Sequence, residues 1–212
     1  MSRKPGDYAR PDRFSRAARA AGYPARSVFK LEEIQQRHRI FRPGQRVLDL
    51  GAAPGSWTLY ASQQVGPSGR VLAVDLSEIS DTLPPNVIAR QLDVLRADRA
   101  LLGEFGPYQV VLSDMAPATS GNKARDQALS YELCAGALGI ADDLSAVDSH
   151  LVLKLFMSPE FAVLKRSLME RYAECRVVRP AATRSQSTEV FLVALRRRPR
   201  AAAGQSSPAP QP

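Results

Sequence analysis

The sequence predicts an α/β fold, with a mostly parallel, seven-stranded sheet whose last strand runs antiparallel. The first observation is the stretch from Val47 to Trp57, VLDLGAAPGSW, where a short apolar strand runs into a turn of small residues and then a helix. The second is an alternation of short apolar runs with helical patterns. The third is that the loop before the last strand is too short for a helical crossover, so the last two strands pair antiparallel.

Each expected strand is a short apolar run bounded by polar or turn residues. The expected strands are residues 47–50, 71–74, 87–92, 108–112, 150–156, 175–178 and 190–195. The expected helices carry apolar residues at helical spacing. They are residues 24–38, 57–65, 97–105, 127–144 and 161–172. Strands and helices therefore alternate along the chain until the final pair of strands.

The positive charge is concentrated at the two ends of the chain. The net charge of the whole chain is +8, of which residues 1–26 carry +5 and residues 196–212 carry +4. We divide the chain into a basic N-terminal arm (residues 1–22), a folded domain (residues 23–195) and a basic, proline- and alanine-rich tail from residue 196 that is predicted to be disordered. Two basic ends on a near-neutral domain favour a nucleic-acid partner, and a role in solubility is the alternative.

The composition argues against several other classes of protein. No apolar run is long enough to span a bilayer, and the N-terminus lacks the apolar stretch of a secretory signal. Cys134 and Cys175 are far apart and show no metal-ligand spacing, and the only histidines are His38 and His150. We therefore expect a cytoplasmic monomer without a metal.

The turn after the first strand indicates a bound nucleoside. Gly51 and Gly55 allow close backbone approach at a helix N-terminus, although their spacing is that of neither a dinucleotide-binding turn nor a phosphate-binding loop. Asp75 ends the second strand about 20 residues later, where a carboxylate accepts hydrogen bonds from ribose hydroxyls. A ligand with a ribose but no phosphate chain fits best, and S-adenosylmethionine is the obvious one. A tight connection without a ligand is the alternative.

Two more carboxylates belong to the same edge of the predicted sheet. Asp93 ends the third strand and Asp114 follows the fourth. One aspartate at a strand end is usually a turn residue or a helix cap. Three of them beside the glycine turn, with Asp75 included, indicate a ligand site at the carboxyl ends of the strands.

Three charged residues occupy positions where apolar residues are expected. Lys154 interrupts the apolar run LVLKLF, and Glu189 directly precedes VFLVAL. Lys30 shares a helix face with Ile34, so its side chain is expected to lean inward. Lysine and glutamate are rarely buried without a partner or a task. The alternative is that each side chain reaches solvent at an edge.

Five segments between Arg26 and Leu195 resemble the FtsJ-type ribose 2′-O-methyltransferases: SVFKLEEI, VLDLGAAPGSW, SDMAP, LVLKLF and TEVFLVAL, in the family's order and spacing. The resemblance implies the Rossmann-like S-adenosylmethionine-dependent methyltransferase fold for residues 23–195. It implies methylation of a uridine ribose in 23S ribosomal RNA of the large subunit. The implied catalytic set is Lys30, Asp114, Lys154 and Glu189. The implied cofactor contacts, with the glycine turn included, are Gly51, Gly55, Trp57, Asp75, Asp93 and Asp114.

The expected reaction moves a methyl group to a ribose hydroxyl by in-line displacement, so the protein orients two partners and manages one proton. Lys154 is the candidate to accept that proton or to stabilise the alkoxide, and Asp114 is expected to orient Lys154. Glu189 is expected to steer Lys30 or the ribose. Trp57 either shapes the cofactor pocket or packs a helix on the sheet. RNA is expected to bind residues 10–26 and the surface around Lys30.

Three other functions compete with this interpretation. Transfer RNA is the alternative substrate for the same reaction. A nicotinamide-dependent oxidoreductase shares the glycine turn and Asp75, but the glycine spacing is wrong and Lys154 and Glu189 have no role in it. A non-catalytic RNA-binding assembly factor fits the charge, but it leaves the four catalytic-type residues unexplained.

Overall fold

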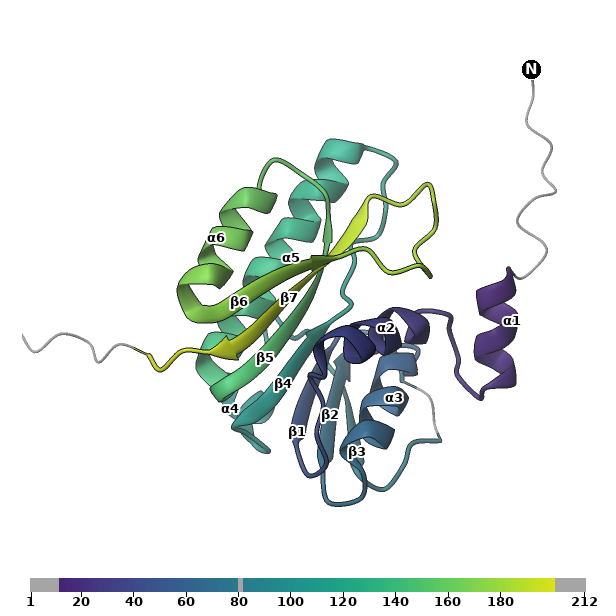
Figure 1. Cartoon of the computed structure of the whole chain (residues 1–212), viewed down its shortest axis with the longest axis vertical. Helices are drawn as coiled ribbons and strands as arrows, with labels where there is room; N and C mark the ends of the chain where they lie inside the picture. Colours follow the sequence, from purple (N-terminus) through teal and green to yellow (C-terminus); the bar gives the residue numbers. More distant parts are fainter. Residues whose placement is uncertain (1–11, 80–81, 201–212) are drawn as a thin grey trace, which may run out of the picture.

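The computed structural model describes residues 12–79 and 82–200. Within these residues, seven strands form one sheet with helices on both faces (Figure 1). The strands are β1 (Arg46–Leu50), β2 (Arg70–Asp75), β3 (Val87–Gln91), β4 (Tyr108–Ser113), β5 (Ser145–Phe156), β6 (Tyr172–Val178) and β7 (Glu189–Arg197). The helices are α1 (Arg13–Ala20), α2 (Val28–His38), α3 (Ser56–Val65), α4 (Arg99–Gly103), α5 (Lys123–Leu144) and α6 (Phe161–Arg171).

The sheet has the predicted topology. Its strand order is β3-β2-β1-β4-β5-β7-β6. The pairs among β1 to β5 are all parallel, and β7 runs antiparallel to both β5 and β6. As a result, the start of β7 lies at the same edge as the carboxyl ends of the parallel strands. The prediction of a mostly parallel sheet with an antiparallel last strand is confirmed.

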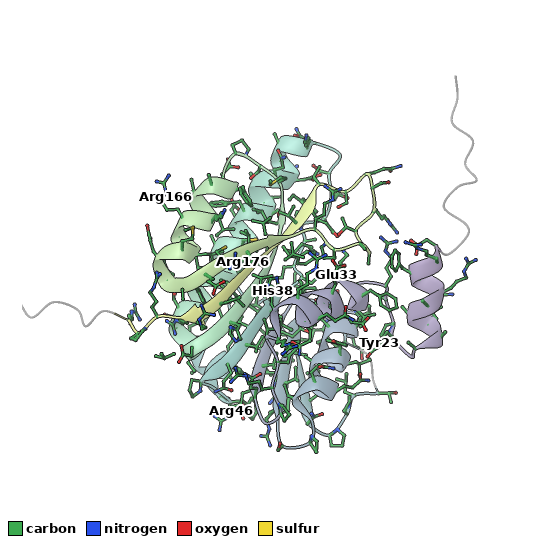
Figure 2. All side chains as sticks on the ribbon, viewed as in Figure 1. Tyr23, Glu33, His38, Arg46, Arg166 and Arg176 are labelled. Atoms are coloured by element: carbon green, nitrogen blue, oxygen red, sulfur yellow. The ribbon has the colours of Figure 1, made fainter. Side chains whose placement is uncertain are left out.

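Two apolar cores cover the two faces of the sheet. One core joins the sheet to α4, α5 and α6, with Leu48, Leu153 and Leu192 as strand residues. The other joins it to α1, α2 and α3, with Val152 and Phe191 on the opposite side of the same strands. The alternation along each strand follows from the period of two in strand side chains, which supplies both faces with apolar groups. Charged side chains such as those of Arg46 and Arg166 project outward instead (Figure 2).

The connection into α2 is fastened at two points. The hydroxyl of Ser56, at the start of α3, accepts a hydrogen bond of 2.7 Å from the backbone N–H of Ala25. The hydroxyl of Tyr23, which is labelled in Figure 2, donates a hydrogen bond of 2.6 Å to Gln63 on α3. Helix α2 therefore begins at Val28, four residues later than predicted, because these contacts hold the preceding residues in a turn.

Helix α1 falls inside the segment that we interpreted as a basic, weakly patterned arm. Asp12 caps it by accepting the N–H of Ser15 at 2.9 Å. Ala18 is buried against the domain, and the Phe14 ring lies 5.9 Å from that of Phe29 on α2. Part of the basic arm is thus docked on α2 (Figure 1). Residues 1–11 of the predicted arm lie outside the described residues.

The prediction that disorder begins at residue 196 is wrong for the first arginines of the tail. Strand β7 continues to Arg197. Arg196 forms an ion pair with Glu174, and Arg197 donates to the backbone oxygens of Ser145 and Asp142. Arg198 donates to the carbonyl of Glu170 at 3.0 Å. Carboxylate and carbonyl acceptors on the neighbouring elements hold these side chains. The tail from residue 201 lies outside the described residues.

Candidate active site

The glycine turn packs against the loop that follows β4. Gly51 has a φ of +75°, and a Cβ atom there would lie 2.5 Å from Cγ of Met115. Gly55 has a φ of +106° and directly precedes α3. Both positions therefore require glycine, since a side chain is strained at these φ values and would clash at Gly51. The turn lies at the carboxyl ends of β1 and β4, where we predicted a ligand site from the sequence.

Asp75 and Asp93 both lie where predicted, at the ends of β2 and β3. Asp75 accepts the N–H of Ala53 at 2.9 Å and that of Ser77 at 2.7 Å, so it fixes the glycine turn directly. Asp93 accepts the N–H of Leu95 at 3.0 Å and forms an exposed ion pair with Arg96. A carboxylate has about four lone-pair sites, so both can accept further hydrogen bonds. Their cofactor contacts stay predictions.

Lys154 forms the first buried ion pair of the site. Its Nζ lies 2.9 Å from Oδ1 of Asp114 and donates to the Asp114 carbonyl. The lysine is 8% exposed, so the alternative that it reaches solvent is wrong. The partner comes from the end of β4, the strand beside β5. The predicted proximity of Lys154 and Asp114 is confirmed.

Lys30 and Glu189 form the second buried ion pair. Lys30 Nζ contacts Oε1 of Glu189, and each side chain is 11% exposed. The same carboxylate oxygen accepts a hydrogen bond of 3.2 Å from the hydroxyl of Thr183. Lys30 Nζ also lies 5.7 Å from the centre of the Phe191 ring. The expected inward orientation of Lys30 is confirmed.

The two ion pairs share one face of the sheet. Lys154 is the register partner of Phe191 across the β5–β7 pair, and Glu189 lies two residues before Phe191. Cross-strand partners point to the same face, and so do residues two apart on one strand. That face is covered by α2, which contributes Lys30. Two amines and two carboxylates from α2, β4, β5 and β7 thus gather at the carboxyl edge of the sheet.

The side chain of Trp57, on α3, contacts both the start of α2 and the sheet. Its indole N–H donates to the carbonyl of Ser27 at 2.8 Å, and its ring lies 5.7 Å from that of Phe191. It is 2% exposed. These contacts agree with the packing alternative for this residue, and its contact with the cofactor stays a prediction.

Asp49 is a candidate site residue that the sequence analysis missed. It is fully buried in β1, and Thr58 on α3 donates a hydrogen bond of 2.7 Å to Oδ2. Oδ1 has no hydrogen-bond partner among residues 12–79 and 82–200. Burial raises the pKa of Asp49 to about 7, against the effect of the Thr58 hydrogen bond, and the charges of Asp114 and Asp75 raise it further. The signal was available, since Asp49 interrupts an apolar strand just as Lys154 does.

The raised pKa of Asp49 predicts a pH dependence of stability. The folded protein binds the Asp49 proton more tightly than the unfolded chain, whose ordinary pKa is 3.8. The resulting stabilisation is complete below about pH 4 and is lost as the pH rises through about 7, with a total on the order of 4 kcal/mol. Asp49→Asn is expected to remove this part of the pH dependence, measured by urea unfolding between pH 4 and pH 8. An unchanged dependence in the variant would contradict the assignment.

The thiol of Cys134, which lies behind Lys154, is buried and not placed to react. Burial raises the pKa of Cys134 to about 12, and its thiol lies 3.0 Å from the Lys154 carbonyl. Within the described ranges, no three histidine, cysteine or acidic side chains are placed to hold a metal ion.

The helices of those ranges include none with the length and apolar character needed to cross a membrane.

The fold, together with the four charged residues at the carboxyl edge of the sheet, defines a methyltransferase of the Rossmann-like class. Comparison with known proteins supports this class. Residues 23–197 match the family described as FtsJ-like methyltransferase. The chain therefore belongs to the FtsJ-like methyltransferase family.

Two curated relatives share one name. A protein from Sorangium cellulosum named ribosomal RNA large subunit methyltransferase E is 53% identical over 199 residues, covering 93% of this chain and 94% of the relative. A protein of the same name from Bdellovibrio bacteriovorus is 45% identical, covering 87% and 95%. A solved structure described as a ribosomal RNA methyltransferase from Plasmodium falciparum covers 82% of this chain and 98% of its own, with a TM-score of 0.73 and 19% identity. That likeness supports the fold.

Proposed function

We propose that this protein transfers a methyl group from S-adenosylmethionine to a ribose 2′-hydroxyl, that of a uridine in 23S ribosomal RNA. The observation that carries the proposal is the convergence of the Lys154–Asp114 and Lys30–Glu189 pairs at one sheet edge. The relatives named as large-subunit ribosomal RNA methyltransferases support the substrate class. The antiparallel β7 matters to this function, because it returns Glu189 to the edge where β4 and β5 end.

The residues present fit the proposed cofactor. The unpaired, buried Oδ1 of Asp49 is an acceptor that a cationic ligand group suits, and Asp75 and Asp93 retain acceptor sites for ribose hydroxyls. Gly55 directly precedes α3, whose N-terminus has no side-chain cap among the described residues and is a suitable place for a ligand. When bound, S-adenosylmethionine supplies an activated methyl group on a sulfonium. A proposed role for the protein is then to hold this group in line with the ribose oxygen.

Lys154 is the candidate that stabilises the alkoxide as it forms, as an ammonium held by Asp114, or that receives the proton of the 2′-hydroxyl, for which its amine must be neutral. A positioned proton acceptor contributes about 100- to 10,000-fold to such a step. Asp114 binds Lys154 from two directions, through its side chain and its carbonyl, so it fixes where the amine points. Lys30 is held by Glu189 and by the face of the Phe191 ring, and we assign it to the ribose or its phosphate.

RNA binding is assigned to exposed arginines near this edge. Arg13, Arg16 and Arg19 are exposed on α1, which packs beside α2 (Figure 1). Arg184 is exposed on the β6–β7 loop, five residues before Glu189. Arg26 is different, because its guanidinium group contacts Asp12 and a backbone carbonyl. Phosphate contacts of this kind supply affinity without sequence choice.

The test is labelled-methyl transfer from S-adenosylmethionine to separated ribosomal and transfer RNAs. We expect label in 23S ribosomal RNA, supplied free and as large subunits, and none in transfer RNA. A thermal shift with S-adenosylhomocysteine but not with NAD is expected in parallel. Label in transfer RNA alone would replace the proposed substrate, and a shift with NAD alone would refute the reaction class.

A further inference from the structure

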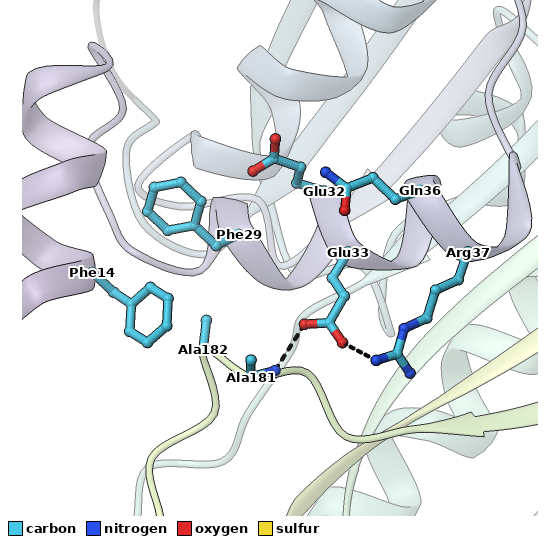
Figure 3. Close-up of a pocket in the computed structure, with 8 residues that line it drawn as sticks. All are labelled: Phe14, Phe29, Glu32, Glu33, Gln36, Arg37, Ala181 and Ala182. Carbon is cyan, nitrogen blue, oxygen red and sulfur yellow. Dashed lines mark hydrogen bonds and ion pairs between the residues drawn. The ribbon is translucent and has the colours of Figure 1, made fainter.

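The carboxylate of Glu33 joins α2 to the β6–β7 loop, residues 179–188. Glu33, labelled in Figure 2, lies on α2, and it is three residues after Lys30 in the same helix. Its Oε2 accepts a hydrogen bond of 2.8 Å from the backbone N–H of Ala181, while Oε1 pairs with Arg37 (Figure 3). The Glu33 side chain is 18% exposed and that of Arg37 is 55% exposed. The Glu33 side chain is thus largely covered, whereas Ala181, which donates the hydrogen bond, is exposed.

Arg26 holds the next residue of the same loop. Its guanidinium donates to the carbonyl of Ala182 at 2.7 Å and pairs with Asp12 at the start of α1. The Ala182 side chain is 1% exposed, so the loop is seated against the helices at this point. Two consecutive loop residues are therefore fixed from the α2 side, one through its N–H and the other through its carbonyl.

This part of the loop leads directly to the Lys30–Glu189 pair. Thr183 follows Ala182, and its backbone N–H donates to the Pro180 carbonyl at 2.9 Å, which closes a turn. The Thr183 hydroxyl donates to the Glu189 oxygen that contacts Lys30. The position of this turn relative to α2 therefore sets the position of the Thr183 hydroxyl, and through it the orientation of the Glu189 carboxylate.

We propose that Glu33 is a positioning residue, which holds the β6–β7 loop so that Thr183 and Glu189 keep Lys30 in its reactive orientation. Glu33 acts through the Ala181 N–H, without touching the reacting atoms. This inference rests on the proposed methyl transfer and deepens it, because it assigns a support for one half of the site. Misplacement of a reacting group by about 1 Å lowers the rate on the order of 100-fold. A residue that holds the loop in place can therefore have a large effect on the rate without touching the substrate.

A rival role for Glu33 is direct contact with RNA. Glu33 lines an open depression between α1, α2 and the loop, together with Phe14, Phe29 and Ala182 (Figure 3). A residue that binds substrate there affects the KM for RNA. A residue that orients Lys30 against the reacting ribose affects kcat instead. The two roles therefore separate in steady-state kinetics.

The experiment combines four variants, with RNA and S-adenosylmethionine varied separately. Glu33→Ala removes the acceptor, and Ala181→Pro removes the donor at the second position of the turn, which proline favours. Each is expected to lower kcat roughly 10- to 100-fold, and the double variant no further, because both break one bond. Glu33→Gln, which keeps an acceptor oxygen, is expected to stay within about twofold of wild type. Arg37→Ala is the matched control and is expected to leave kcat unchanged.

Amide hydrogen exchange of residues 181–189 gives a readout that does not depend on activity. Faster exchange there in Glu33→Ala, but not in Glu33→Gln, is expected. A wild-type kcat in Glu33→Ala, a raised KM for RNA with unchanged kcat, or multiplying effects in the double variant would each overturn the positioning role alone. A wild-type protein that methylates no RNA would overturn the proposed function as well.

Discussion

Lys154→Ala is expected to lower methyl transfer to RNA by about 100- to 10,000-fold, the range for loss of a positioned proton acceptor. The Lys154 amine is buried and held by both the carboxylate and the carbonyl of Asp114. Alanine leaves this part of the site without an amine, while the glycine turn and Asp75 are untouched. Single-turnover methylation measures the loss, and calorimetric titration with S-adenosylhomocysteine checks that the cofactor still binds.

Lys123→Ala is the matched control, since Lys123 is an exposed lysine at the start of α5. It is expected to keep the wild-type rate. A Lys154→Ala protein that binds S-adenosylhomocysteine and keeps full activity would reject the assigned role of Lys154.

Breaking the Lys30–Glu189 pair is expected to lower the free energy of unfolding substantially. Lys30→Met leaves the Glu189 carboxylate buried without its cation, at a cost of about 3 kcal/mol. Glu189→Gln is expected to be similarly destabilising, because it leaves the amine without its counter-charge. The double variant is expected to cost less than the sum of the two, since it leaves no uncompensated buried charge. Urea unfolding at fixed pH gives the three free energies.

An exposed ion pair provides the comparison. Arg176 pairs with Glu174 at the edge strand β6, and its side chain is 60% exposed. Arg176→Ala is expected to cost less than about 1 kcal/mol. Equal losses in Lys30→Met and Arg176→Ala, or strictly additive losses at Lys30 and Glu189, would contradict the description of a buried, coupled pair.

The topology of the sheet was predictable because its signals are local. Each strand is an apolar run, and the short connection between β6 and β7 leaves only an antiparallel arrangement. Helix α1 was missed, although Phe14, Ala17 and Ala18 recur at helical spacing between its arginines. This apolar face is mostly alanine and Ala18 is the one buried residue of the helix, so the signal is weak, and the position of the helix depends on Phe29 and Arg26.

The members of the candidate site were predictable, but the geometry of their contacts was not. A lysine inside LVLKLF is conspicuous in any sequence, because burying an amine is costly. Which carboxylate meets which amine depends on strand register and on where α2 crosses the sheet. Asp114 was expected to orient Lys154 and Glu189 to steer Lys30 or the ribose, and the two ion pairs agree with these expectations. The Thr183 hydroxyl and the loop contacts of Glu33 carry no sequence signal, since polar residues in a loop and on a helix surface are ordinary.

The chemical position of the transferred methyl group tests the central claim most directly. Wild-type protein, labelled S-adenosylmethionine and large-subunit ribosomal RNA are incubated together, and the product RNA is digested completely with alkali. Alkaline cleavage needs a free 2′-hydroxyl, so a methylated ribose survives as a dinucleotide. We expect the label in alkali-stable dinucleotides. Label in mononucleotides would place the methyl group on a base and contradict the account.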